Sequence, residues 1–182
     1  MYYTMKIAGL ERKLELFPVN DKIMIAAFIM FNDVEITKAC AAELLKKAPE
    51  YDIIMTAESK GIPLAYEMAR QAQKPYIVAR KKEKVYMKNV ISTDVDSITT
   101  KGMQTLLLGE DDVELIKGKK ILIIDDVIST GGSIKSLEVL IEKACGTVAG
   151  IMAVLAEGDA QERDDIIYLE PLPLFDNEGN AI

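Results

Sequence analysis

Four consecutive β-forming residues, Ile121–Ile124, make the clearest hydrophobic run in the chain. A strand that is apolar on both faces is typical of a central parallel sheet whose two faces are covered by helices. Apolar residues then recur at helical spacing through Ile134, Leu137 and Leu140, which predicts an amphipathic helix that ends near Gly146. This stretch therefore predicts a buried strand that runs into a helix.

Shorter apolar runs on either side of this stretch predict further strands. Segments with apolar residues at helical spacing separate them, so strands and helices alternate along the chain. The expected fold class is α/β, with a central parallel sheet flanked by helices. The predicted strands cover Tyr51–Ala57, Pro75–Ala79, Val148–Leu155 and Ile166–Leu169.

Two helices are expected upstream of the central strand. The first begins at Asn32 as the N-cap, with Glu35 three residues on as in a capping box, and ends before Pro49. The second follows Gly61 and has Pro63 in its first turn. A strand, a helix and a strand at this spacing form a βαβ unit, which requires parallel strands and a right-handed crossover.

Two stretches depart from this alternation. Among the first thirty or so residues only Lys22–Phe31 is strongly apolar, and we interpret it as a strand. Arg80–Glu114 contains a basic run, alternating β-branched and polar residues, and an acidic turn, which together predict a long hairpin over the carboxyl edge of the sheet. We expect a single domain over residues 1–182, with residues 1–32 and 156–182 as a hood or tail.

The composition narrows the possible chemistry. The 182-residue chain has no histidine, which excludes Ser-His-Asp and Cys-His catalysis and histidine-rich zinc sites. Its net charge of −7, from 22 basic and 29 acidic residues, argues against general affinity for nucleic acid. Any reaction must therefore use carboxylates, lysine, arginine, hydroxyls, backbone amides or a hard metal ion.

The hydrophobic content does not indicate a membrane protein. No apolar run reaches the roughly 18 residues that a membrane-spanning helix needs, and the N-terminus lacks the pattern of a signal peptide. A cytoplasmic location is therefore expected. Cys40 and Cys145 lie far apart in predicted helices, so we expect two small buried side chains rather than a disulfide.

The strand over Ile121–Ile124 ends in two carboxylates and a run of small residues. Asp125 and Asp126 come first, and Ser129–Ser133, with the sequence Ser-Thr-Gly-Gly-Ser, opens the helix. Such a loop can turn several backbone N–H groups toward one anion, and the helix N-terminus adds about half a positive charge. The stretch therefore predicts a phosphate site.

An apolar strand, Asp-Asp, two apolar residues and a Ser-Thr-Gly-Gly-Ser loop resemble the signature of the type I phosphoribosyltransferases. Neither of the competing phosphate motifs, G-x-x-x-x-G-K-[ST] and G-x-G-x-x-G, occurs in the chain. Enzymes of this family transfer a 5-phosphoribosyl group from phosphoribosyl pyrophosphate (PRPP) to a nitrogen nucleophile and release pyrophosphate. The resemblance implies their fold, with a β-hairpin flexible loop and a small hood formed by the chain ends.

This resemblance assigns roles to the residues of the central stretch. Asp125 and Asp126 form the catalytic pair and face the ribose 2′- and 3′-hydroxyls, directly or through Mg²⁺, since ionised carboxylates accept hydrogen bonds and bind hard cations. Mg²⁺ is accordingly the expected cofactor and PRPP the co-substrate. The residues assigned to the 5′-phosphate are Ser129, Thr130, Gly131, Gly132 and Ser133.

Two upstream segments resemble the pyrophosphate-binding parts of adenine phosphoribosyltransferases. Glu58-Ser59-Lys60-Gly61 stands where that family has Glu-Ser-Arg-Gly, so the charge is kept but the bidentate fork of arginine is lost. Such loops often carry a non-proline cis peptide, which we expect around Ser59–Lys60. An ordinary polar turn and a solvated charge run are the alternatives. The basic residues assigned to pyrophosphate are Arg80, Lys81 and Lys84.

The sequence does not specify the acceptor base. Adenine phosphoribosyltransferases have Ser-Tyr-x-Leu-Glu-Tyr-Gly in the mobile loop, and alignment on Gly109 places Gln104, Leu107 and Leu108 at the tyrosine, glutamate and tyrosine. Ser97–Lys101 is more similar to xanthine phosphoribosyltransferases and to purine-operon repressors, which carry an added DNA-binding domain. Aromatic residues that could stack on a base, although each is also a core candidate, are Phe17, Phe28, Phe31, Tyr86 and Phe175.

The expected function is that of an Mg-dependent purine phosphoribosyltransferase in purine salvage, with adenine and the 6-oxopurines both open as acceptors. The changed mobile loop supports a second hypothesis, a PRPP-binding sensor or regulator on the same fold that lacks catalysis. Orotate or uracil as acceptor is disfavoured by the Glu-Ser-x-Gly loop. The expected partners are PRPP and a purine base, with no nucleic acid and no membrane, and the family implies a homodimer.

Overall fold

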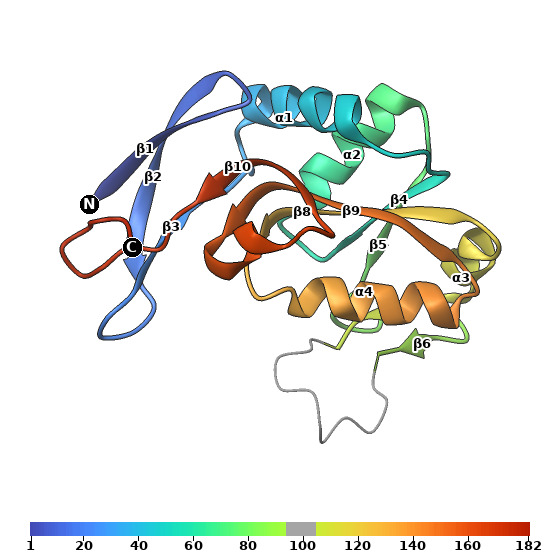
Figure 1. The fold of residues 1–182 in the computed structure, drawn as a ribbon. Helices are drawn as coiled ribbons and strands as arrows, with labels where there is room; N and C mark the ends of the chain where they lie inside the picture. Colours follow the sequence, from blue (N-terminus) through green and yellow to red (C-terminus); the bar gives the residue numbers. More distant parts are fainter. Residues whose placement is uncertain (94–104) are drawn as a thin grey trace.

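The computed structural model describes residues 1–93 and 105–182. Within these residues the centre is a five-stranded sheet in the order β10-β9-β8-β4-β5, and every neighbouring pair is parallel (Figure 1). The predicted α/β class with a central parallel sheet is therefore confirmed. The strands are β4 (Ile53–Ala57), β5 (Tyr76–Ala79), β8 (Lys120–Ile128), β9 (Thr147–Glu157) and β10 (Ile167–Leu172).

Helices cover both faces of this sheet. On one face lie α1 (Val34–Lys47) and α2 (Ile62–Ala72), and on the other lie α3 (Glu110–Ile116) and α4 (Gly132–Lys143). Successive residues of β8 alternate between the two cores, because side chains of a strand point to opposite faces. All four residues of Ile121–Ile124 are 0% exposed, which explains why the run is apolar without interruption.

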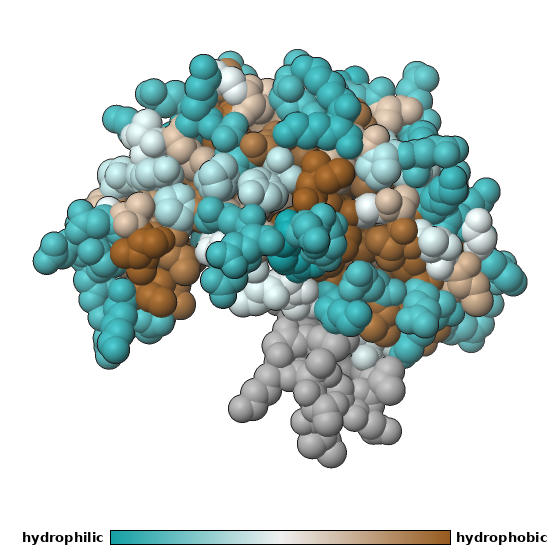
Figure 2. All heavy atoms as spheres, in the orientation of Figure 1, coloured by the Kyte–Doolittle hydropathy of each residue, from teal (hydrophilic) through white to brown (hydrophobic). Residues whose placement is uncertain are grey.

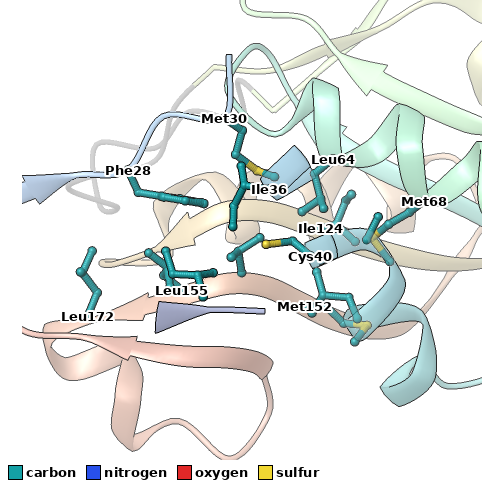
Figure 3. Close-up of a cluster of buried hydrophobic side chains, with 14 of the residues drawn as sticks. Phe28, Met30, Ile36, Cys40, Leu64, Met68, Ile124, Met152, Leu155 and Leu172 are labelled. Carbon is teal, nitrogen blue, oxygen red and sulfur yellow. The ribbon is translucent and has the colours of Figure 1, made fainter. Parts of the chain in front are cut away.

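The core on the side of α1 and α2 is built from large aliphatic side chains. Figure 3 shows Ile36 and Cys40 of α1 and Leu64 of α2 facing Ile124 and Met152 of the sheet. Each fully buried large apolar side chain stabilises the fold by roughly 1.5–3 kcal/mol. The same burial raises the pKa of the Cys40 thiol to about 12, so this cysteine packs as a small hydrophobic residue.

Cys145 differs from the expectation of a buried cysteine. It is exposed and adopts a φ of 57°, just after α4 ends at its C-cap Ala144. At this turn the chain reverses direction toward β9, so the side chain leaves the apolar face of the helix. The prediction of two buried cysteines is therefore correct only for Cys40.

Both chain ends form a small second layer beside the main sheet (Figure 1). In the described N-terminal part, β1 (Tyr2–Ile7), β2 (Leu10–Pro18) and β3 (Met24–Ala27) make an antiparallel sheet, and β3 is shorter than the strand predicted over Lys22–Phe31. The C-terminal tail joins this sheet because Phe175 and Met24 exchange backbone hydrogen bonds of 2.8 and 3.0 Å. The two chain ends therefore lie together as the hood prediction requires, whereas β10, within the predicted hood or tail of residues 156–182, belongs to the main sheet.

The surface of this small sheet is partly apolar. Figure 2 shows a hydrophobic patch on the part of the molecule formed by this small sheet, at the left, whereas much of the remaining face is hydrophilic. Large hydrophobic residues of the two chain ends that are exposed by 46–68% include Met1, Tyr2, Phe17, Val19 and Ile182.

The start of α1 lies one residue later than predicted. Asp33 is the N-cap, and its Oδ1 accepts a hydrogen bond of 3.0 Å from the backbone N–H of Ile36. Arg12 of β2 fixes this carboxylate, with its Nε 2.7 Å from Oδ2 of Asp33. Asn32 instead adopts a φ of 67° in the turn before the helix, so its assignment as N-cap is wrong.

The hairpin predicted over Arg80–Glu114 is present in part. The antiparallel pair β6 (Ile91–Ser92) and β7 (Leu107–Leu108) forms its base, and Lys143 of α4 donates a hydrogen bond of 2.6 Å to the carbonyl of Ser92. The acidic residues after it begin α3 rather than a turn. Their negative charges interact favourably there with the positive N-terminal end of the helix dipole. Gln104 and Ser97–Lys101 lie outside the described residues.

No helix in residues 1–93 and 105–182 has both the length and the apolar composition that a membrane span requires.

Candidate active site

The carboxyl ends of four neighbouring strands bring the predicted site residues to one edge of the sheet. The order β9-β8-β4-β5 is parallel throughout, so the segments that follow these strands meet at the same edge. A cavity of about 150 Å³ opens there, after the last residues of β8. Its lining consists of Asp125, Val127, Ile128, Ser129, Thr130, Gly131, Gly132, Ser133 and Ile134.

The loop predicted to bind the 5′-phosphate surrounds much of this cavity. Ser129 and Thr130 are exposed, and Gly131 adopts a φ of 76° as the residue before α4. No side chain of residues 1–93 or 105–182 caps this helix end, which leaves the first backbone N–H groups of α4 available to an anion. The positive φ explains why position 131 is glycine.

The two adjacent aspartates occupy different environments because successive residues of β8 face opposite sides. The Asp126 side chain is 3% exposed, and its Oδ2 has no hydrogen-bond donor among the described residues. Asp125 borders the cavity, and its Oδ1 accepts a hydrogen bond of 2.9 Å from the Asp126 backbone N–H. Burial, followed by the charge of Asp126, holds the pKa of Asp125 well above its ordinary value.

The loop between β4 and α2 approaches both aspartates. Nζ of Lys60 lies 3.4 Å from Oδ2 of Asp126. Gly61 is buried so closely that a Cβ there would lie 3.1 Å from Oδ1 of Asp125 and would overlap the hydroxyl of Thr56. The non-proline cis peptide joins Glu58 and Ser59, one bond earlier than the position predicted.

Glu58 connects this loop to the basic run after β5. Its Oε1 lies 3.7 Å from Nη1 of Arg80 and 3.9 Å from Nζ of Lys84. The backbone N–H of Lys81 donates to Oε2 at 3.0 Å. This hydrogen bond, then the charges of Lys84 and Arg80, lowers the pKa of Glu58. The two segments that the sequence assigned to pyrophosphate are therefore in contact, and the side chain of Lys81 itself is exposed.

Two charged residues near the cavity were not anticipated. Glu157, the last residue of β9, is 8% exposed and lies close enough to Ser129 for the two side chains to interact. Burial raises the pKa of Glu157, whereas Ser129 and the charge of Lys60 oppose that shift. Its place at the end of a predicted strand was the available signal, since ligands bind at strand carboxyl ends in such sheets.

Arg163 is the second unanticipated residue. It follows the short helix η1 (Gly158–Glu162), and its Nη1 lies 2.6 Å from the position that a Cβ would take on Gly131. No local motif marks this residue, because only the fold of the segment after β9 brings it to the loop.

The leucines aligned with the mobile-loop motif lie in β7. Leu108 is 0% exposed and belongs to the core on the side of α4. Leu107 exchanges backbone hydrogen bonds of 2.8 and 2.9 Å with Arg80, so it joins the hairpin base to the basic run. Neither side chain supplies the carboxylate that adenine phosphoribosyltransferases have at this motif.

The five candidate stacking residues separate clearly by exposure. Phe28 and Phe175 are 4% and 1% exposed and belong to the core, which leaves no face for a base. Phe17, Phe31 and Tyr86 are exposed by 46%, 44% and 70%.

Comparison with known proteins identifies the family. The profile of the phosphoribosyl transferase domain matches residues 31–178, which is most of the chain. This chain belongs to the phosphoribosyltransferase family. The phosphoribosyltransferase is 31% identical over 144 residues to the adenine phosphoribosyltransferase of Kosmotoga olearia, a match that covers 78% of this chain and 76% of that one.

Other relatives of this phosphoribosyltransferase differ in their named substrates. The purine biosynthesis transcriptional repressor PurR of Bacillus subtilis is 36% identical over 135 residues, which cover 73% of this chain and 47% of the repressor. Further relatives are named xanthine and hypoxanthine/guanine phosphoribosyltransferases. The crystal structure of adenine phosphoribosyltransferase from Thermoanaerobacter pseudethanolicus has a TM-score of 0.71 and 21% identity, and covers 87% of this chain and 95% of that chain. It confirms the type I fold.

Proposed function

We propose that this phosphoribosyltransferase transfers the 5-phosphoribosyl group of PRPP to a free purine base in purine salvage, yielding a nucleoside 5′-monophosphate and pyrophosphate. The observation that carries the proposal is the contact of Lys60 with Asp126, since it joins the loop assigned to pyrophosphate to the carboxylates assigned to ribose. A donor with a phosphate, a ribose and a pyrophosphate requires these three sites side by side.

Different residues at the sheet edge are assigned to different parts of the donor PRPP. The loop Ser129–Ser133 offers backbone N–H groups and hydroxyls to the 5′-phosphate. Asp125 and Asp126 accept hydrogen bonds from the ribose hydroxyls, while Lys60 and the cluster of Glu58, Arg80, Lys81 and Lys84 face the pyrophosphate. Loss of pyrophosphate leaves a sugar with oxocarbenium character, so positioning and electrostatic stabilisation supply most of the catalysis.

The carboxylate pair suits Mg²⁺ bound together with substrate. Among the described residues no group of three acidic or sulfur ligands forms a complete metal cage. Mg²⁺ commonly takes one or two protein carboxylates and completes its shell with water and phosphate oxygens. The buried Oδ2 of Asp126, which accepts no hydrogen bond within the described part of the chain and has only the Lys60 ion pair, fits that role. Bound Mg²⁺ would neutralise charge on the departing pyrophosphate.

The acceptor is proposed to be a purine because the named relatives act on adenine, xanthine or hypoxanthine/guanine. The test incubates the protein with PRPP, Mg²⁺ and each of adenine, hypoxanthine, guanine, xanthine, uracil and orotate, and measures pyrophosphate release and nucleotide formation. We expect turnover with one or more purines and none with the pyrimidines. Absence of pyrophosphate release with every base would reject the enzymatic proposal.

A PRPP-binding regulator is the second candidate function. It is supported by Leu107 and Leu108 at the mobile-loop motif, and by the likeness to the repressor PurR over its shared 135 residues. Calorimetric titration separates the two candidates: a regulator binds PRPP and releases no pyrophosphate with any base, whereas the enzyme consumes PRPP once its acceptor is added.

We also propose a homodimer that uses the outer side of α2 and β5. Tyr66 and Tyr76 meet there in an edge-to-face pair with ring centroids 6.2 Å apart, and their side chains are 54% and 38% exposed. Aromatic residues such as tyrosine are enriched at protein interfaces relative to the rest of the surface. Sedimentation analysis should give twice the mass of 20.1 kDa for the native chain and the monomer mass for Tyr66→Asp. A monomeric native protein rejects this proposal.

A further inference from the structure

Arg163 touches the phosphate loop although it comes from the far end of the chain. Its Nη1 lies 2.6 Å from the position that a Cβ would occupy on Gly131. Any side chain at residue 131 would therefore collide with the guanidinium, whereas glycine leaves room for it. The guanidinium of Arg163 therefore lies against the backbone of Gly131, the residue before α4.

Asp165 fixes the orientation of this guanidinium. Nε of Arg163 lies 2.8 Å from one carboxylate oxygen of Asp165, and Nη2 lies 2.7 Å from the other. Nη1 has no acceptor within residues 1–93 and 105–182, and it is the nitrogen that faces Gly131. The arginine side chain is 31% exposed, so its remaining donors are accessible to a ligand.

Carboxylates near the loop would repel a bound phosphate unless a cationic side chain offsets their charge. Glu157 lies close to Ser129, and the charge of Glu138 on α4 raises the pKa of Arg163. Lys135, the nearby lysine of α4, already pairs with Glu138 at 3.3 Å. A phosphate dianion in this loop would meet two carboxylates, and helix amides alone offset only about half a charge.

We propose that Arg163 binds the 5′-phosphate of the donor through Nη1, together with the backbone amides of Ser129–Ser133. The inference rests on the proposed function and adds a binding residue to it. Guanidinium N–H groups form strong charge-assisted hydrogen bonds to phosphate oxygens. Asp165 acts as a positioning residue, since it occupies two nitrogens of the fork and directs the third toward the loop.

The experiment measures binding rather than turnover. Calorimetry compares the native protein with Arg163→Gln and Arg163→Lys, using ribose 5-phosphate and pyrophosphate as separate ligands. Arg70→Gln is the matched control, because Arg70 makes the same two-nitrogen pair with Glu67 on α2 at 2.9 and 2.8 Å. Thermal unfolding of each variant checks that the fold is retained.

The inference predicts that Arg163→Gln weakens ribose 5-phosphate binding about tenfold or more, and leaves pyrophosphate binding unchanged. Arg163→Lys should bind ribose 5-phosphate with intermediate affinity, and Arg70→Gln should bind like the native protein. A purely structural role of Arg163 would affect both ligands equally and would overturn the inference, as would unchanged ribose 5-phosphate affinity. If the native protein binds PRPP but not ribose 5-phosphate, only this inference fails; if it binds neither, the proposed function fails as well.

Discussion

Nζ of Lys60 lies 3.4 Å from Oδ2 of Asp126, an oxygen that is buried and accepts no hydrogen bond from the described residues, so the two groups meet as an ion pair. The lysine side chain is 57% exposed and the aspartate 3%, so an ammonium group open to solvent lies against a buried carboxyl group. The two residues belong to loops that the sequence assigned to different parts of PRPP. Under the proposed function, their contact links pyrophosphate binding by Lys60 to the charge state of the aspartate pair.

Lys60→Gln should reduce turnover about tenfold or more, since one charge-assisted contact contributes roughly 1.5–3 kcal/mol. Its free energy of unfolding should change by less than about 1 kcal/mol, because an exposed lysine contributes little to stability. Lys46→Gln is the control, since Lys46 is 67% exposed and pairs with Glu43 at 2.6 Å on α1. Steady-state kinetics with varied PRPP make the measurement, and equal loss in both variants would contradict the assignment.

The double change Asp125→Asn with Asp126→Asn should abolish turnover and leave the fold intact. The raised pKa of Asp125 means that its charged form is less favourable in the folded state than in the unfolded state. Its contribution to stability is therefore greatest below the ordinary pKa of the carboxyl and is lost as the pH rises through the raised value.

The single variant Asp125→Asn should accordingly unfold at the same or a higher temperature than the native protein at pH 7, and at pH 4 the difference should shrink. Scanning calorimetry at the two pH values tests this. Asp164→Asn, at an exposed position, is the control. Activity that survives the double change would show that the ribose site has been assigned wrongly.

Glu58 should keep its charge at a lower pH than an ordinary glutamate. The Lys81 backbone N–H, then Lys84 and Arg80, lower its pKa, so the cluster persists above the ordinary value and is lost as the pH falls through the lowered one. Arg80→Gln should move the Glu58 pKa back toward 4.5 and raise the KM for PRPP. Carbon-detected NMR titration of the Glu58 carboxyl measures the shift. Lys82→Gln, in the same run but without a contact to Glu58 among the described side chains, should change neither quantity.

Gly131→Ala should weaken ribose 5-phosphate binding strongly, because the new methyl group would strain the loop and displace Arg163. Gly118→Ala is a close control: Gly118 has a φ of 71°, near the 76° of Gly131, and nothing lies within 4 Å of its Cβ position. Both variants should lose roughly 1–2 kcal/mol of stability from the left-handed backbone. Denaturant unfolding and calorimetry separate the two effects, and equal ligand affinity in both variants would refute the role of this position.

The sequence by itself determined the central strand, the helices beside it and the loop Ser129–Ser133. Local forces suffice there: a run of apolar β-formers must be buried on both faces, and small residues after a strand permit the turn into a helix. Parallel strands bring the segments that follow β8, β4 and β5 to one edge, which agrees with the assignment of Lys60 and Arg80 to one site, whereas the order of these strands came from the structure.

Only the tertiary structure decided which charges meet. Glu157 and Arg163 stand in segments without a motif, and they reach the loop because β9 pairs with β8 and the segment after η1 returns to Gly131. The contact between Lys60 and Asp126, and the pairing of Phe175 with Met24 in the hood, likewise join residues far apart along the chain. Hydrophobic periodicity reports which side chains are buried, whereas such contacts depend on packing between elements and leave no periodic signal.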